Sequence, residues 1–420
     1  MVEQQKFALS WKWMIMGNDF SHQKEINYRA IYGKLFSGLL NQFGANYVAE
    51  IEDAIQNSFL KFLKIRTQYG KPDHLENWLF VVARNDVLNQ IKIRQKQNNF
   101  GTLESVDEEA DIKNDKDLRL QTIVFIASLK NVSIQAKILF ILKNIFGLNI
   151  AEIHDSTLLS QDAIYKSISR TLKSIQLEFN NKTKEINSIS VNPQAVTIVE
   201  EILYAVFNIG FDSFNEQTEN IVNEDLCLDA FSLTKLLFQQ YRYDTTSNLL
   251  ALFCFHIARL PAKIDEGKLI PFFKQNREKW DKELISLGFN YLKKPASISK
   301  FYLEALIISK YILIEQFTSN DWKDIVKLYE IMQTVSQSPI VKLNYCFCLS
   351  KIDRTEEALK ILSEIEDELP NEHVYFSLIK AKLLKDIKPR EADDLFMSVV
   401  NKLDQKIRKE YLLENEFKKF

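Results

Sequence analysis

The sequence is poor in the residues that most often end helices. Only 10 Gly and 8 Pro occur among 420 residues, whereas 46% of the residues are hydrophobic. Gly and Pro are unfavourable inside helices and common in turns, and the apolar residues here recur in long patterns of helical period. The composition therefore predicts an all-α protein with large cores, and the length leaves room for two or three domains.

Cysteine, histidine and net charge are also sparse. Cys227, Cys254, Cys346 and Cys348 lack the spacing of metal ligands, so we expect reduced thiols in the core of a cytoplasmic protein. The 5 His residues form no metal motif, and the formal net charge is −2. Because no global positive field attracts nucleic acid, any such binding must come from local basic patches.

The features of several functional classes are missing as well. The sequence contains no glycine-rich phosphate loop, metal-ligand set or nucleophile elbow, so we expect neither catalysis nor a cofactor. We expect the charged clusters 265–267 and 276–281 to form a salt-bridge network or a domain contact rather than an acid–base site. The apolar patch Trp11–Met16 is interrupted by Lys12 and is too short to cross a bilayer, so we expect no membrane segment there.

Residues 148–175 (LNIAEIHDSTLLSQDAIYKSISRTLKSI) indicate two helices joined by a tight turn. The second helix is expected to begin after Ser160 as its N-cap, with Asp162 in the first turn, where a carboxylate suits the helix dipole. Its apolar residues form one stripe: Ile164, Ile168, Leu172 and Ile175. Its opposite face carries hydrogen-bonding and cationic side chains: Gln161, Tyr165, Lys166, Ser169, Arg170 and Lys173. A helix of this kind fits the major groove of DNA; the alternative is a helical hairpin with a solvated face.

Two further helices are predicted upstream, on either side of a loop at 67–76. The first, 48–63, buries Ile51, Ile55, Phe59 and Phe62 or Leu63, and it carries a separate polar and acidic group: Glu50, Glu52, Asp53 and Gln56. The second, 77–97, is mostly apolar from Trp78 to Ile93. It ends in a basic run of Lys92, Arg94 and Lys96.

The segments EIEDAIQNSFLKFL and ENWLFVVARNDVLNQIKIRQ resemble region 2 of the extracytoplasmic-function sigma factors of bacterial RNA polymerase. The resemblance implies that the acidic helix binds core polymerase, with its β′ and β subunits as partners. The contacts would come from Glu50, Glu52, Asp53 and Gln56. It implies that the loop and the helix after it bind the −10 promoter element. A pocket for an unpaired base needs aromatic or polar walls, which these side chains would supply: Arg66, Gln68, Tyr69 and His74. The remaining −10 contacts would come from the second helix: Asn77, Trp78, Arg84, Asn85, Lys92, Arg94 and Lys96. Trp78 is equally well explained as a core anchor.

The stretch 99–117 is acidic and lacks an apolar period, as is typical of a flexible linker. Two helices are predicted within 118–146, as the platform for the helix-turn-helix. This arrangement resembles region 4 of the same family, which binds the −35 element, although His154 and Ser167 depart from the family pattern.

The C-terminal half contains an internal repeat. Leu328, Leu362 and Phe396 are spaced by 34 residues, as are Ala358 and Ala392, and this is the tetratricopeptide period. We expect helix pairs at 302–315 with 321–333, 339–351 with 355–366, and 372–385 with 390–403. Residues 195–420 resemble the C-terminal extension of a sigma-factor subgroup with a tetratricopeptide-like domain. Such stacks present a concave face that commonly binds a peptide or a protein segment.

The predicted organisation is region 2 at 1–98, a linker at 99–117, region 4 at 118–180 and a helical regulatory domain at 195–420. The favoured interpretation is a sigma factor that directs polymerase to promoter DNA, with the C-terminal domain regulating it. The alternative is a helical protein-binding scaffold whose sigma-like part has lost DNA recognition. The modest basicity of the helix after Ser160 motivates this alternative.

Overall fold

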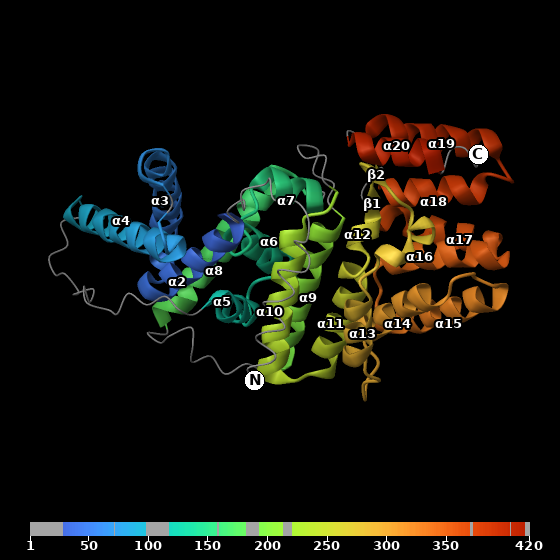
Figure 1. Cartoon of the computed structure of the whole chain (residues 1–420), viewed down its shortest axis with the longest axis horizontal. Coiled ribbons are helices and arrows are strands. Elements are labelled where there is room, and N and C mark those ends of the chain that lie inside the picture. The colour runs from blue at the N-terminus through green and yellow to red at the C-terminus, as the bar shows by residue number, and fades with distance from the viewer. Residues whose placement is uncertain are drawn as a thin grey trace.

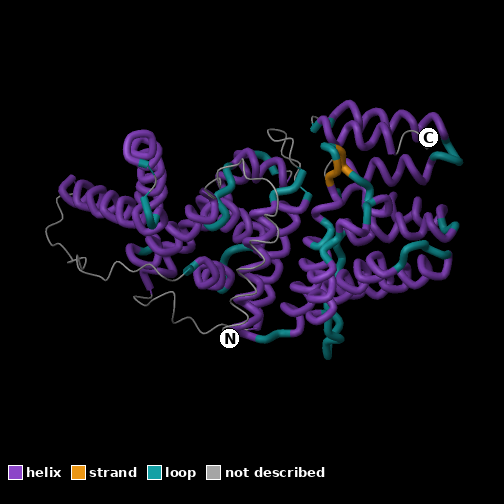
Figure 2. The backbone as a smooth tube through the Cα atoms, viewed as in Figure 1, coloured by secondary structure: helices purple, strands orange, loops and turns teal. Residues whose placement is uncertain are grey.

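The computed structural model describes residues 28–70, 72–97, 117–157, 159–181, 193–212, 221–369, 373–403 and 405–415. Within these ranges the regular structure is helical except for one two-stranded antiparallel sheet (Figures 1 and 2). The prediction of an all-α protein is thereby confirmed. The patch Trp11–Met16 and nearly all of the predicted acidic linker lie outside the described residues.

The N-terminal helices form a three-helix group with one short 3-10 turn. Its elements are α2 (Tyr28–Phe43), η1 (Ala45–Tyr47), α3 (Val48–Tyr69) and α4 (Leu75–Gln97). Helix α3 continues to Tyr69, so the loop predicted at 67–76 is shorter than expected. The helix ends at Gly70, whose φ of 83° lies in the region that favours glycine.

The next group carries the predicted helix-turn-helix. Its elements are α5 (Arg119–Ala127), α6 (Ile134–Asn144), α7 (Ile150–Thr157) and α8 (Gln161–Asn181). The side chain of Ser133 caps α6, and the buried ammonium of Lys137 donates to the carbonyl of Ala127 (2.7 Å) at the end of α5. Contacts of this kind satisfy the backbone groups that helix ends leave unpaired.

A third group follows in the middle of the chain. Its elements are α9 (Pro193–Phe211), α10 (Glu224–Tyr241), α11 (Asp244–Ile257), α12 (Leu260–Lys263), β1 (Ile264–Asp265), β2 (Lys268–Leu269), η3 (Phe272–Lys274), η4 (Arg277–Lys279) and α13 (Lys282–Tyr291). Among the described helices, α9 is the one that by length and composition alone could cross a membrane. Its Val199, Leu203 and Phe207 are instead buried against neighbouring helices, as is typical of a core helix.

The C-terminal helices form a stack at the right of Figure 1. Its elements are α14 (Lys300–Leu313), α15 (Ser319–Val335), α16 (Pro339–Leu349), η5 (Ser350–Ile352), α17 (Thr355–Ile365), η6 (Glu366–Glu368), α18 (Val374–Leu384), α19 (Pro389–Lys402) and α20 (Lys406–Asn415). The helices α14 to α19 match the six predicted ones to within a few residues. Ala358 and Ala392, at the 34-residue spacing, are completely buried.

One continuous hydrophobic core joins the first three groups and reaches α14. The ring centroids of Phe36 in α2 and Phe140 in α6 are 6.4 Å apart, and the rings of Phe207 in α9 and Phe253 in α11 stack at 3.9 Å. A separate core fills the stack from α14 to α18, and a third lies among α18 to α20. The two groups that the sequence separates by an acidic stretch therefore pack against each other.

Ion pairs reinforce this packing between groups. The guanidinium of Arg119 in α5 lies 2.8 Å from the carboxylate of Asp117 and 3.2 Å from that of Asp229 in α10. In α2, Arg29 pairs with Glu152 of α7. The four cysteines are buried and free of disulfides, in agreement with the expectation of core thiols.

Candidate nucleic-acid interface

The turn between α7 and α8 is fixed by local hydrogen bonds. At the start of α7, Asn149 and Glu152 cap each other, with side chain to backbone distances of 2.8 and 2.9 Å. The ring nitrogen Nδ1 of His154 lies 2.6 Å from the carbonyl of Leu159. This contact explains why a histidine lies where the two helices cross. Its ring nitrogen is the hydrogen-bond partner of a carbonyl in the turn.

Helix α8 begins as predicted. The hydroxyl of Ser160 accepts a hydrogen bond from the backbone N–H of Ala163 (3.3 Å), and Asp162 lies in the first turn. The predicted apolar stripe faces the core, because Ile164 and Ile175 are fully buried. On the same side, the hydroxyl of Thr171 lies 3.4 Å from the carbonyl of Ala136 in α6. The buried face therefore holds α8 on its platform.

The opposite face of α8 is open to solvent. The six side chains predicted to contact DNA are all exposed: Gln161, Tyr165, Lys166, Ser169, Arg170 and Lys173. Tyr165 is 58% exposed. Among the described residues none forms an ion pair with Lys166, Arg170 or Lys173. The six side chains, from Gln161 to Lys173, lie along about 18 Å of one helix, at 1.5 Å per residue. The face can thus offer three free cations and several hydrogen-bonding groups to one ligand.

The residues predicted to bind the −10 element divide into two sets at opposite ends of α4. Arg66, His74 and Asn77 are exposed near the tip of the α3–α4 hairpin. Trp78 is half-buried, with its ring 6.4 Å from that of Phe62, so it serves at least as a packing residue. The side chains of Gln68, Tyr69 and Lys96 lie outside the described residues.

Arg84 does not join this exposed set. It lies midway along α4 and is only 6% exposed, whereas its neighbour Asn85 is exposed. The predicted DNA contact Arg84 is thus almost fully buried in this arrangement. The apolar Ile93, near the end of the same helix, is 56% exposed.

The basic end of α4 lies beside the start of α3. Lys92 and Arg94 are exposed, about 25 Å along the helix from Asn77. The guanidinium of Arg94 lies 2.6 Å from the carboxylate of Glu50 and 5.9 Å from the ring centroid of Tyr47. The predicted phosphate contact Arg94 is therefore already paired with a predicted polymerase contact.

The acidic group on α3 is likewise divided. Glu52 is half-buried, with its carboxylate 2.6 Å from the ammonium of Lys143 in α6. Burial and the nearby carboxylates of Glu52 and Asp53 raise the pKa of Tyr32 well above its usual value. Asp53 and Gln56 are exposed. Asp53 and Gln56 are thus accessible to a partner, whereas Glu50 and Glu52 are paired with Arg94 and Lys143 of the same chain.

Two apolar side chains extend the open face of α3. Leu60 is 57% exposed, and Leu63, which the sequence allows as an alternative to Phe62 for the buried position, is 46% exposed. With Asp53 and Gln56 they follow the spacing of one helical face. That spacing was a usable signal, but the adjacent Phe62 at the fully buried position masked it. We call Asp53, Gln56, Leu60 and Leu63 the α3 face.

The charged cluster near residue 277 is a domain contact, as expected. The guanidinium of Arg277 donates to the carbonyls of Ile312 (2.6 Å) and Ile314 (2.6 Å) at the end of α14. It also lies 4.8 Å from the ring centroid of Trp280. Asp281 caps α13 by accepting from the backbone N–H of Leu284 (2.9 Å). These groups serve helix ends and the junction of the core with the stack.

Comparison with known proteins gives limited further information. Residues 195–296, which span α9 to α13, match the model of a family of unknown function (DUF6596). An uncharacterized protein of Rhizobium meliloti (strain 1021) is 23% identical over 350 residues, which cover 80% of this chain and 82% of that protein. No solved structure matches. The similarity to the Rhizobium protein extends well beyond the matched family segment.

Proposed function

We propose that this protein is a sigma factor of the extracytoplasmic-function type, which directs bacterial core RNA polymerase to promoter DNA. The observation that carries the proposal is the outer face of α8, where Lys166, Arg170 and Lys173 are exposed and unpaired among the described residues. A helix presented on a buried platform with such a face is the geometry that enters a major groove. The −35 element is its proposed target.

The α3 face supports the second part of the proposal. Exposed apolar side chains flanked by polar ones mark protein-binding sites more often than isolated surface leucines do. Leu60 and Leu63 lie beside Asp53 and Gln56 on one helix. We propose that this face docks on a helical element of the polymerase, and that Arg66, His74 and Asn77 at the hairpin tip meet the −10 element.

The contacts between the two N-terminal groups indicate how the free protein differs from the proposed bound one. Lys143 pairs with Glu52, Arg29 pairs with Glu152, and the amide of Gln176 in α8 donates to the carbonyl of Ala45 (3.3 Å). A protein that binds two separate DNA elements at once must move its two N-terminal groups apart. We infer that the arrangement described here is a closed state that opens on polymerase.

The C-terminal stack is proposed to regulate this opening. It joins the rest through α14, which shares the main core, and it lies at the opposite end of the molecule from α3 and α4 (Figure 1). A peptide or protein segment bound on the stack would act through these shared helices. Because the sequence supplies no catalytic constellation, the polymerase would carry out all of the chemistry.

Transcription in vitro tests the proposal directly. Purified full-length protein is mixed with bacterial core RNA polymerase and fragmented genomic DNA from the source organism, and transcripts are mapped. We expect transcripts that start at defined sites and that depend on the added protein. Folded protein that never yields such transcripts would contradict the proposal.

DNA binding at several salt concentrations separates the proposal from the scaffold alternative. If Lys166, Arg170 and Lys173 contact phosphates, log K should fall against log salt with a slope of roughly −2 to −3. Binding to polymerase without any salt-dependent binding to DNA would favour a protein-binding scaffold.

A further inference from the structure

A cavity of about 390 Å³ lies where the core meets the last helices of the stack. The end of α9, the α11–α12 segment and the chain after β2 form one side, and α18, α19 and α20 form the other. Apolar and aromatic side chains make up most of its wall, including Phe211, Phe272 and Phe396. The volume is in the range of small-molecule sites.

The charges in this wall are mostly positive. Arg259, Lys263 and Arg408 are 5%, 8% and 4% exposed, and Lys382 adds a fourth cation. Asp212 is the single carboxylate in the lining that the structure describes. Burying several like charges around one cavity is costly unless opposite charge compensates them.

The carboxylate of Asp212 is already fully engaged. It lies 2.9 Å from the guanidinium of Arg408, and it accepts a hydrogen bond from the hydroxyl of Tyr375 (2.6 Å). The ammonium of Lys263 lies 3.8 Å from it and donates to the carbonyl of Phe211. Burial raises the pKa of Asp212, but its cationic partners outweigh this and lower the pKa below its usual value.

Arg259 has no carboxylate partner among the described residues. Its one side-chain hydrogen bond there is with Nδ1 of His256 (3.2 Å), and its buried Nε has no partner. The guanidinium stacks over the ring of Phe272, with 4.2 Å from Cζ to the centroid. Burial lowers the pKa of Arg259 to about 9, which is the effect expected where a buried cation has no carboxylate beside it. Burial also lowers the pKa of Lys263 to about 8, although Asp212 opposes this shift.

Two other buried arginines have carboxylate partners, which Arg259 lacks among the described residues. Arg119, 4% exposed, lies between Asp117 and Asp229 at 2.8 and 3.2 Å, and Arg408 pairs with Asp212. Arg259 is equally buried but has only a neutral ring nitrogen beside it, because burial first and the neighbouring cations second hold the pKa of His256 far below its usual value. A guanidinium in such a place calls for an anion from outside the chain.

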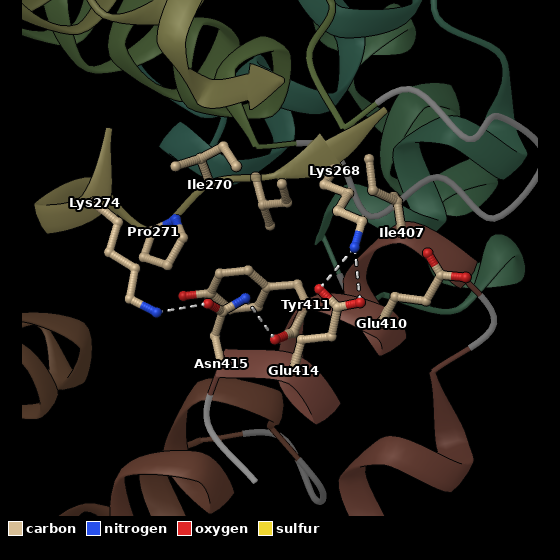
Figure 3. Close-up of a pocket in the computed structure, with 10 residues that line it drawn as sticks. Lys268, Ile270, Pro271, Lys274, Ile407, Glu410, Tyr411, Glu414 and Asn415 are labelled. Atoms are coloured by element: carbon tan, nitrogen blue, oxygen red, sulfur yellow. Dashed lines mark hydrogen bonds and ion pairs between the residues drawn. The ribbon is translucent and has the colours of Figure 1, made fainter. Parts of the chain in front are cut away.

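A neighbouring pocket of about 280 Å³ gives a contrast. It lies where β2 and the segment after it meet α20 (Figure 3). There the ammonium of Lys268 is 2.9 Å from the carboxylate of Glu414, and that of Lys274 is 3.0 Å from the amide oxygen of Asn415. Its cations are satisfied within the chain, so it offers no comparable site. These contacts hold α20 against the larger cavity.

We propose that the larger cavity binds a small organic anion, with one phosphate or carboxylate group at Arg259 and an apolar or aromatic body among the rings. A phosphate or carboxylate can take paired hydrogen bonds from the guanidinium, and Lys263 lies on the same wall. Phe211 and Phe272 provide faces for an aromatic body. Because the ligand would contact both α12 and α20, its binding would fix the last helices of the stack onto the core. The proposal does not depend on the sigma-factor assignment.

Calorimetric titration of the full-length protein tests the site with phenyl phosphate as the probe. We expect one saturable site, with inorganic phosphate binding more weakly and neutral phenol not binding measurably. Arg259→Met should weaken the binding of phenyl phosphate about 10- to 100-fold. The control Arg390→Met, at an exposed position, should bind phenyl phosphate like the original protein. Equal binding by the Arg259→Met variant, or no saturable binding by the original protein, would overturn the proposal. Inorganic phosphate binding as tightly as phenyl phosphate would overturn the role given to the rings.

Melting temperatures give an independent test. Phenyl phosphate at about 100 times its Kd should raise the melting temperature of the original protein by about 3 °C. Without ligand, Arg259→Met should melt no lower than the original protein, because it removes an uncompensated buried charge, whereas Arg119→Met should melt well below it. Equal losses in the two variants would show that Arg259 is structural and would overturn the assignment. If Arg259→Met does not fold, Lys263→Met is titrated by the same criteria.

Hydrogen exchange locates the effect. Phenyl phosphate should slow exchange of the amides of α20 and α12 in the original protein and leave α8 unchanged. Protection confined to other helices would place the bound probe elsewhere and would overturn the site.

Discussion

Helix α8 and the helices around α9 use charge in opposite ways. On α8, Lys166 and Arg170 project into solvent from a helix whose other face is buried. Around α9, Arg259, Asp212 and Glu304 lie in the interior or at its edge. Burial shifts the pKa values of Arg259 and Glu304, and at Asp212 the cationic partners outweigh burial and lower the pKa. Exposed cations change the free energy of folding little and stay available to bind a large anionic partner. Buried charges make stability depend on pH and on what occupies the neighbouring cavity.

The largest expected effect comes from reversing charge on α8. Lys166→Glu with Arg170→Glu should reduce DNA-dependent activity about 1000-fold, since each such contact is worth about 1–3 kcal/mol and repulsion is added. The melting temperature should barely change, because both side chains are exposed. Gel-shift titration and transcription in vitro measure the loss.

A matched control reverses two exposed lysines in the stack, Lys323→Glu with Lys360→Glu. It changes the net charge equally and should leave DNA binding intact. A large fall in melting temperature for the α8 variant alone would mean that its outer face is structural, and the contrast with α9 would fail.

The next largest effect concerns Glu304, which lies in α14 close to Tyr204 of α9. Burial raises the pKa of Glu304 from 4.5 to about 7. Because the folded state holds this proton more tightly than the unfolded chain, stability falls as pH rises from 4.5 to 7 and is lowest above that range. Glu304→Gln should therefore increase the free energy of unfolding at about pH 8 by at most about 3 kcal/mol, with little gain at about pH 4.

Chemical denaturation of the two proteins at both pH values measures this difference. A variant that is destabilised equally at both pH values would show that the carboxylate is stabilising, contrary to the expectation for a buried charge.

A smaller effect is expected on the α3 face. Leu60→Glu should weaken binding to core polymerase about 10-fold, because it removes an apolar side chain from the proposed contact. Stability should be unchanged, since Leu60 is 57% exposed. Leu313→Glu, at a position 65% exposed in α14, is the control. Equal binding by all three proteins would remove the α3 face from the proposal.

The smallest effect concerns the contact between the two N-terminal groups of helices. Lys143→Met removes the 2.6 Å pair with Glu52 and should destabilise the closed arrangement by about 0.5–1 kcal/mol. Polymerase binding should then strengthen about 2- to 5-fold, as binding no longer competes with this contact. Lys310→Met, which breaks a 3.6 Å pair with Asp324 in the stack, should have no such effect. Unchanged or weaker binding by the Lys143 variant would contradict the closed state.

Local periodicity explains which features could be predicted from the sequence. The stripe of Ile164, Ile168 and Ile175 and the buried Ala358 and Ala392 follow from helical and 34-residue spacing, and both are as expected. The six predicted residues on the outer face of α8 are exposed for the same reason. A pattern within one helix specifies its inner and outer faces whenever a single neighbour covers it.

Other features depend on contacts between distant segments. Arg84 is only 6% exposed, and the sequence of α4 alone does not say which of its sides the neighbouring helices cover. Asp212 and Arg408 meet across 196 residues, and Arg259, unlike Arg119, has no carboxylate partner among the described residues. No spacing rule identifies which of several basic residues ends up without a carboxylate.

Gly33 in α2 gives the closed arrangement a steric requirement. A Cβ atom at this position would lie 1.9 Å from the carbonyl oxygen of Ile145, which follows α6. The two helices therefore meet backbone to backbone at a point where even a methyl group does not fit. A single alanine there would act as a wedge that keeps the two groups apart, although every charged side chain that pairs across them is retained.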